Sequence, residues 1–440
     1  MSERLKYMCE RLSVPQPWKK LSIILCGFAF FKEFRPSEPF IFEFIAGNWD
    51  LGREDVMRHV LPTKNYVYLT IFILVFLIND LVIYKTLIIY LGLSGSVVFG
   101  LLLWTTDYLE LQISQIFYGT FMATEVAYYT YIYAKVPTEF YQQVTSHTRA
   151  ALLVGRALSG FLAQILVSFD AMDYRELNYI TFAALIAATI WAIFLPSVQK
   201  SIYFHRMQEE NQHLTASKYK TAFSLMKKHF IDSFSNKYVL RWSIWWALAT
   251  AGFIQVQVYI QPLWSEIQKE SNSDEENFNI YNGAVEAILT IIGALGALGA
   301  GFIKTDWKHK GELMLCVCSL FGGAFILICS QTTSVVVSYV CYVLFGGLYH
   351  FMITIASAEI AKFIMEDSYG LVFGLNTLVA LTCQTFLTLC FVTGDLGLAL
   401  SPRDQYLVYG IYHIIISALY IVIGLTAWMR SNRDIQKTYT

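Results

Sequence analysis

The chain is poor in charged residues. Asp, Glu, Lys and Arg make up 15% of its 440 residues, whereas a soluble globular chain carries about a quarter. Hydrophobic residues make up 56% of the chain, and its mean hydropathy is +0.48. The core of a soluble protein cannot bury so much apolar surface, but a surface that faces lipid can use it. The composition therefore predicts a membrane protein.

Several functional motifs are missing as well. The sequence has no Walker motif, no Ser-His-Asp set and no zinc-ligand set, so we expect neither an enzyme nor a cofactor. Cys316 and Cys318 lie two residues apart within an apolar run, a spacing unlike that of a zinc knuckle. A basic domain is also missing, so we expect no nucleic-acid partner. The charged first 20 residues lead directly into an apolar run, and we expect no cleavable signal peptide.

What the sequence does contain is a series of long apolar runs. A membrane-spanning helix needs about 20 mainly apolar residues. The runs do not alternate every second residue, as the strands of a membrane barrel would. We therefore expect an all-α, polytopic membrane protein with twelve transmembrane helices. These predicted spans cover residues 19–45, 66–84, 87–105, 112–134, 150–169, 177–195, 239–261, 281–303, 312–330, 334–358, 370–393 and 405–428.

A long polar segment divides the predicted spans six and six. We expect an N-terminal half over residues 1–195, a cytosolic linker over 196–238, a C-terminal half over 239–428 and a cytosolic tail over 429–440. Within the linker, Tyr219–Phe234 fits either a helix lying along the membrane or a plain connecting loop. Two six-helix halves match the layout of major-facilitator carriers, which bind substrate near the midplane between their halves.

The lysines and arginines orient the predicted spans. If the N-terminus is cytosolic, 23 of the 32 Lys and Arg residues fall on the cytosolic side and 6 on the opposite side. Cytosolic loops of membrane proteins carry such an excess of positive charge. We therefore expect both termini to be cytosolic.

Ionisable residues within the spans are the best candidates for a site. Each costs about 2.5–3.5 kcal/mol at the centre of a membrane helix and usually faces a cavity or a partner. Glu125 lies in the fourth span, with Tyr128 and Tyr129 one helical turn away. A carboxylate beside aromatic rings suits an organic cation. The alternative is an ion pair of Glu125 with Arg156 or another basic group, which holds two helices together.

Three further acidic residues have two interpretations each. Glu286 lies four residues after Asn282. It either binds the substrate or a coupling proton, or it only makes a hydrogen bond between helices. Asp80, near the end of the second span, is a gate or a helix-end ion pair. Pro36 must perturb the first span, so that Glu38 lines a cavity or merely follows a structural break.

Ten stretches of the chain carry a family resemblance. The chain resembles the reduced folate carriers and thiamine transporters, with the stretches in the family's order along almost the whole chain. They are CGFAFFKEFRPSEPF (26–40), VFLINDLVIYK (75–85), ATEVAYYTYIYAKV (123–136), EFYQQVTSHTRAALLVGRALSGFLAQILVS (139–168), LRWSIWWALATAGF (240–253), VYIQPLW (258–264), IYNGAVEA (280–287), AGFIKTDW (300–307), LVFGLNTLVALTCQTFLTL (371–389) and DQYLVYGIY (404–412).

Charge separates the two branches of that family. Three cationic positions typical of the folate branch fall here at Glu125, Gly346 and Gln384, so three positive charges are absent and one is reversed. The resemblance to the thiamine branch implies that Glu38, Glu125, Tyr128 and Asn282 contact the substrate; we add Glu286 and Gln384 as candidates. One position departs from that branch, because Lys64 stands where it has a stacking tryptophan.

By this resemblance the chain is a carrier for thiamine or a related cationic heterocycle, working by alternating access in the plasma membrane. Its partners would be the vitamin, the lipid bilayer and a coupling proton or anion. A reduced folate is the alternative substrate. A receptor or scaffold that keeps the fold without transport, and a membrane-embedded enzyme, are the alternatives from other functional classes.

Overall fold

The computed structural model describes residues 17–49, 51–78, 84–136, 140–197, 218–271, 280–303, 305, 307–365, 368–394 and 397–438. Within these ranges the regular structure is entirely helical. The helices of the first part are α2 (Pro17–Glu33), η1 (Glu38–Phe40), α3 (Ile41–Asn48), α4 (Arg53–Asp55), η2 (Val56–Val60), α5 (Leu61–Ile78), α6 (Tyr84–Trp104), α7 (Tyr108–Lys135), α8 (Tyr141–Ser168) and α9 (Tyr174–Ile193). Those of the second part are α11 (Lys218–Ser235), α12 (Lys237–Ser271), α13 (Asn282–Phe302), α14 (Trp307–Gln331), α15 (Val335–Ala361), α16 (Tyr369–Phe391) and α17 (Pro402–Thr438).

Among the described residues, ten helices are long and apolar enough to cross a membrane. They correspond to ten of the twelve predicted spans. The other two predicted spans are α2 and α7. α2 has 17 residues because the helix breaks before Pro36, and α7 has 28 residues but is more polar. Both pack within the bundle, α2 against α8 and α9 and α7 against α5 and α6.

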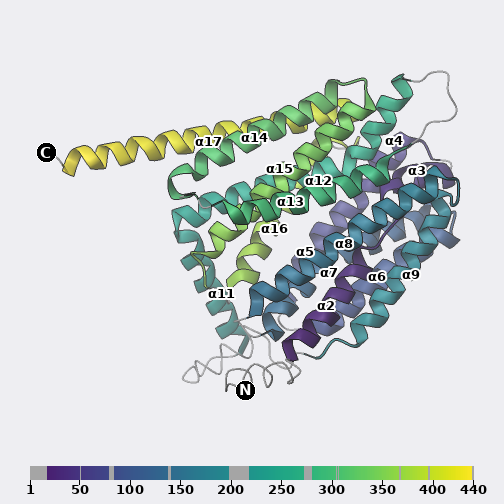
Figure 1. The fold of residues 1–440 in the computed structure, drawn as a ribbon, viewed down its shortest axis with the longest axis horizontal. Coiled ribbons are helices and arrows are strands. Elements are labelled where there is room, and N and C mark those ends of the chain that lie inside the picture. The colour runs from purple at the N-terminus through teal and green to yellow at the C-terminus, as the bar shows by residue number, and fades with distance from the viewer. Residues whose placement is uncertain are drawn as a thin grey trace, which may run out of the picture.

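The helices pack in two groups, which Figure 1 draws in purple to blue and in teal to yellow. The first group joins α2 and α5–α9, and the second joins α12–α17. Between the groups, α8 packs against α13, and α5 packs against α16. The fold is that of an all-α, polytopic membrane protein.

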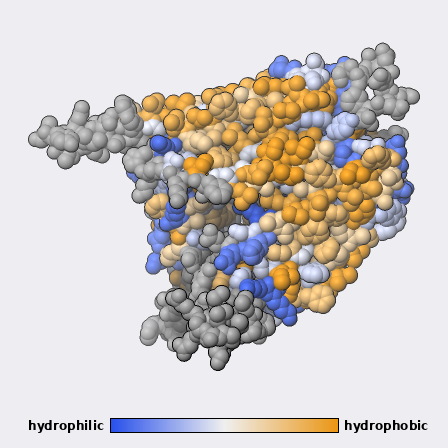
Figure 2. Space-filling view, in the orientation of Figure 1, coloured by the Kyte–Doolittle hydropathy of each residue, from blue (hydrophilic) through white to orange (hydrophobic). Residues whose placement is uncertain are grey.

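Apolar side chains cover the outside of the bundle. In Figure 2 they spread over most of the visible face, while hydrophilic side chains gather toward its two ends. Leu298 and Leu313 are about two-thirds exposed, at 65% and 66%. A water-soluble monomer rarely shows so broad an apolar surface, but hydrocarbon solvates it without cost.

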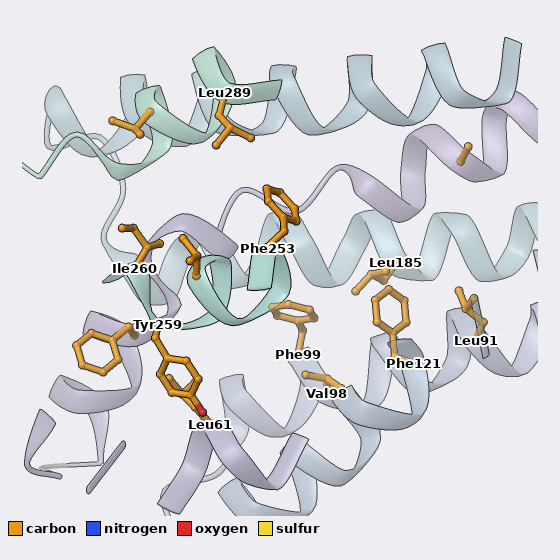
Figure 3. Close-up of a cluster of buried hydrophobic side chains, with 14 of the residues drawn as sticks. Leu61, Leu91, Val98, Phe99, Phe121, Leu185, Phe253, Tyr259, Ile260 and Leu289 are labelled. Carbon is orange, nitrogen blue, oxygen red and sulfur yellow. The ribbon is translucent and has the colours of Figure 1, made fainter. Parts of the chain in front are cut away.

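One buried hydrophobic cluster runs through both groups of helices. Phe253 and Tyr259 of α12 and Leu289 of α13 belong to the same cluster as Leu61 of α5 and Phe99 of α6 (Figure 3). Aromatic and branched side chains therefore fill much of the space between the groups, and polar groups are confined to a smaller region.

Two predicted boundaries differ from the structure. Span one is predicted as continuous over residues 19–45, but α2 ends at Glu33 and the chain bends before η1. Span two is predicted from residue 66, but the helical segment starts at Arg53, and the apolar stretch covers Arg53–Phe76. Lys64 therefore lies inside a helix rather than in a loop.

The linker contains the helix that Tyr219–Phe234 predicts. It is α11, which packs against α12 and α16. His229 Nδ1 lies 2.9 Å from Ser368 Oγ, which joins α11 to the start of α16. The plain-loop alternative is wrong for this segment. Its contact with a membrane stays a prediction.

Candidate functional site

The break in the first predicted span creates the centre of the site. Pro36 lacks an amide hydrogen, and a residue before proline avoids helical backbone angles. The chain therefore leaves the helix after Phe34, whose amide still donates to the carbonyl of Phe30 at 3.0 Å. It re-forms a turn at Glu38, whose amide donates to the carbonyl of Arg35 at 3.2 Å. Arg35 and Glu38 thereby flank the bend between α2 and α3.

Glu33 is the hub of a buried ion-pair network. Its carboxylate accepts from Lys32 Nζ at 2.8 Å, from Arg35 Nη2 at 3.1 Å and from Arg156 Nη2 at 2.8 Å. Glu33 is almost fully buried, at 2% exposure. A buried charge is costly unless ionic partners and hydrogen bonds compensate it. Three cationic groups around one carboxylate have an uncompensated positive charge, so further acids must lie nearby.

Two more acids supply that balance. Lys32 Nζ lies 2.5 Å from Glu125 Oε1 on α7. Arg35 pairs with Glu38, which also accepts a hydrogen bond from the Tyr118 hydroxyl. Three acids and three bases thus form one neutral network.

The network borders a cavity of about 210 Å³ between the two helix groups. The first group contributes charged, aromatic and small residues, and α12 and α13 contribute the rest. The lining residues are Glu33, Arg35, Glu38, Pro39, Ile41, Phe42, Leu61, Lys64, Asn65, Tyr68, Tyr118, Met122, Arg156, Ser159, Gly160, Ile254, Gln257, Val258, Gln261 and Glu286. A larger groove, about 510 Å³, lies between α6 and α9, but no charged side chain lines it. The cavity between the groups is therefore the candidate substrate site.

Three of the predicted site residues line this cavity: Glu38, Arg156 and Glu286. Glu286 accepts a hydrogen bond from the Tyr342 hydroxyl at 2.9 Å. Arg156 pairs with Glu33 and not with Glu125. Glu125 pairs instead with another basic group, Lys32, as the alternative interpretation allows.

The other predicted site residues lie outside the lining. Glu125 is 23% exposed and also accepts from the Tyr129 hydroxyl at 3.0 Å. The Tyr128 hydroxyl donates to the carbonyl of Leu25 at 2.9 Å. Gln384 Nε2 donates to Gln255 Oε1 at 3.0 Å. Asp80 lies outside the described residues.

Asn282 joins the two helix groups. Its Nδ2 donates to the carbonyl of Pro39 at 3.2 Å, and its Oδ1 accepts from the Tyr339 hydroxyl at 3.2 Å. Gln261 makes a similar bridge, accepting from the amide of Phe42 at 3.2 Å and donating to the carbonyl of Glu38 at 3.1 Å. These bonds tie both side chains to the segment formed by η1 and the start of α3.

Sequence reasoning missed Tyr118 and Met122 as lining residues. Both lie on α7, seven and three residues before Glu125, so they share its helical face. That spacing is the signal that could have found them. Gln261 carries no such signal, because its role depends on backbone groups of η1 and α3.

Comparison with known proteins now identifies the family. The sequence profile of the reduced folate carrier family matches residues 16–408. The chain belongs to the reduced folate carrier family. Human thiamine transporter 2 is 34% identical to this carrier, over 97% of this chain and 95% of its own. Folate transporter 1 of Caenorhabditis elegans is 33% identical, over 96% of each chain.

Solved structures resemble this carrier in fold alone. The nucleoside transporter NupG has a TM-score of 0.61 at 12% identity, over 91% of this chain and 98% of its own. An inward-facing bacterial homologue of the lysosomal transporter Spinster has a TM-score of 0.64 at 12% identity, over 94% and 98%. These matches and the two helix groups together show that the fold is major-facilitator-like.

Proposed function

We propose that this carrier moves thiamine, or a related cationic heterocycle, across the plasma membrane by alternating access. The observation that carries the proposal is the carboxylate of Glu286, which lines the cavity between the helix groups. Among the described residues it has no cationic partner within salt-bridge distance, and its one hydrogen bond comes from Tyr342. Curated relatives at 33–34% identity are named thiamine transporters. A cationic substrate would supply the missing partner.

Aromatic side chains of the cavity support the same substrate class. Phe42, Tyr68 and Tyr118 line it. An organic cation over such rings gains about 0.5–2 kcal/mol, with the larger values where water is excluded. Glu125 contributes less than its sequence context suggests, because Lys32 already neutralises it. The proposal therefore depends on Glu286 rather than on Glu125.

The transport cycle follows from the two helix groups. We propose that the halves over residues 1–195 and 239–428 rock against each other, joined by a cytosolic linker over residues 196–238. Both termini are proposed to be cytosolic, as the excess of positive charge in those loops favours. The Glu286 carboxylate can take up a coupling proton when no substrate is bound, and an anion is the other coupling ion to test.

Uptake of radiolabelled thiamine and of a reduced folate, side by side in cells expressing the chain, tests this function. We expect saturable thiamine uptake. Glu286→Gln should raise the KM for thiamine about 10–100-fold, the loss expected when one hydrogen bond to a charged group is removed. Glu54→Gln is the matched control, because Glu54 is 64% exposed and does not line the cavity; its KM should not change.

Other outcomes point to the alternatives. Folate transport is the second candidate, favoured by the cationic Lys64 in the cavity and by relatives named folate transporters. Saturable folate uptake without thiamine uptake would overturn the proposal in its favour. Uptake of neither vitamin, with normal expression at the cell surface, would favour a receptor or scaffold.

A further inference from the structure

Two charged side chains of the cavity stand outside the ion-pair network. Glu33, Glu38, Arg35 and Arg156 all take part in pairs. Lys64 lines the same cavity but, in the described part of the chain, no carboxylate lies within salt-bridge distance of it. The cavity therefore holds one lone cation and, at Glu286, one lone anion.

The surroundings of Lys64 do not neutralise it. Its Nζ lies 5.2 Å from the centre of the Tyr118 ring, a cation–π contact, and no group in the described part of the chain accepts a hydrogen bond from it. Glu38 and Arg35 line the same cavity as Lys64. Glu38 is already held by Arg35 and by the Tyr118 hydroxyl. An anion in the cavity would be the missing partner of Lys64.

The surroundings of Glu286 resemble those of Lys64, with the sign of the unpaired charge reversed. Arg156 and Glu38 line the same cavity as Glu286. Arg156 is held by Glu33 at 2.8 Å. The Tyr342 hydroxyl reaches one oxygen of the Glu286 carboxylate, and no described group donates to the other. A cation or an N–H donor in the cavity would complete this site.

The two lone charges come from opposite helix groups. Lys64 lies on α5, and Glu286 lies on α13. A molecule that satisfies both would bridge the groups across the cavity, which is where a carrier of this fold binds its substrate. A simple cation would leave Lys64 unpaired, and a simple anion would leave Glu286 unpaired.

We infer that the preferred substrate carries both charges: a cationic, N–H-rich heterocycle that contacts Glu286 and an anionic group, phosphate or carboxylate, that contacts Lys64. This inference rests on the proposed function and narrows its substrate class. Of the two anionic groups, a phosphate monoester of the heterocycle places the second charge on the same small molecule. A folate places two carboxylates at the end of a longer one.

Thiamine and thiamine monophosphate are matched probes for this inference, because they differ only in the phosphate. Their equilibrium binding to the purified, full-length carrier avoids hydrolysis of the ester by cells. We expect the monophosphate to bind about tenfold more tightly or better, the ratio that one charge-assisted hydrogen bond supplies. A reduced folate, tested in parallel, shows whether carboxylates serve as well as the phosphate.

Variants at position 64 separate charge from structure. Lys64→Gln should remove the preference for the monophosphate, and Lys64→Arg should keep it. Lys310→Gln, at an exposed position away from the cavity, should leave it unchanged. A melting curve for each variant checks that the carrier is folded, and Lys64→Arg carries the test if Lys64→Gln does not fold.

Each remaining outcome has one meaning. If thiamine binds as tightly as its monophosphate, or if the preference persists in Lys64→Gln, the inference is wrong and the proposed function stands. Tighter binding of the reduced folate than of either thiamine compound, lost in Lys64→Gln, assigns the anionic group to carboxylates. If none of the three ligands binds, the proposed function fails, and this inference fails with it.

Discussion

At the residue scale, Lys32 holds together acids from two helices. Its ammonium lies 2.8 Å from Glu33 on the same helix and 2.5 Å from Glu125 on α7. Lys32 itself is 2% exposed. Attraction between charges is strong in such a dry place, but so is the cost of removing one partner. Lys32 and Glu125 should therefore stabilise the carrier as a unit.

Single and double substitutions test this unit. Lys32→Met and Glu125→Gln should each destabilise the carrier by at most about 3–5 kcal/mol, the range for breaking a buried pair. The double variant should lose about 1–3 kcal/mol less stability than the two single variants lose together. Thermal unfolding of the purified carrier in detergent measures the three changes. Lys20→Met, at an exposed position, is the control, and strictly additive losses would show that the pair is not coupled.

At the scale of elements, α8 and α13 cross at two glycines. A Cβ atom at Gly160 would lie 2.7 Å from the carbonyl oxygen of Gly283, and one at Gly283 would lie 2.8 Å from that of Gly160. Backbone oxygens cannot move aside as a flexible side chain can. This crossing is also one of the contacts between the two helix groups, so the glycines set how closely the halves approach there.

Alanine at position 283 should separate the two helices. We expect Gly283→Ala to cost about 1–3 kcal/mol through overpacking, partly offset by about 1 kcal/mol of helix propensity. Gly299→Ala on the same helix is the matched control, since a Cβ there meets nothing within 4 Å. The temperature of thermal unfolding and the rate of vitamin uptake should both fall in Gly283→Ala and stay unchanged in Gly299→Ala. Equal behaviour of the two would mean that the crossing is loose.

At the scale of the whole molecule, the two halves meet at one end of the bundle, where η1, α3, α4 and the starts of α13 and α17 gather. Arg58 Nη2 donates to the carbonyl of Ala399 at 2.7 Å, and Gln164 Nε2 donates to that of Ile280 at 2.9 Å. The bridges made by Asn282 and Gln261 belong to the same end. By the charge bias of the loops, this end is expected to face outward.

A cross-link across this end should stop transport. Gln405 Nε2 lies 3.5 Å from Met57 Sδ, and the two residues belong to opposite halves. We expect a Met57→Cys, Gln405→Cys carrier treated with a short thiol-specific cross-linker to lose vitamin uptake, and a reducing agent to restore it. Each single cysteine variant, treated in the same way, should keep its uptake. Undiminished uptake by the cross-linked carrier would contradict an alternating opening at this end.

Local sequence determined most of the architecture. Runs of apolar residues predict helices in lipid without knowledge of any partner, since each backbone group is satisfied within its own segment. The same runs predicted twelve spans, and ten of them match helices that are long and apolar enough to cross a membrane. The quoted motifs predicted the family, and the family profile confirms it. These features are local and add up along the chain.

Only the tertiary structure decided which charges are neutralised. The sequence leaves open whether Glu125 has a basic partner, and it presents Glu286 as one candidate among several. In the fold, Lys32 reaches Glu125, whereas Glu286 keeps no cationic partner among the described residues. Ion pairs depend on the separation of side chains that are far apart in sequence, 93 residues for Lys32 and Glu125. Helix packing sets that separation, and no local pattern encodes it.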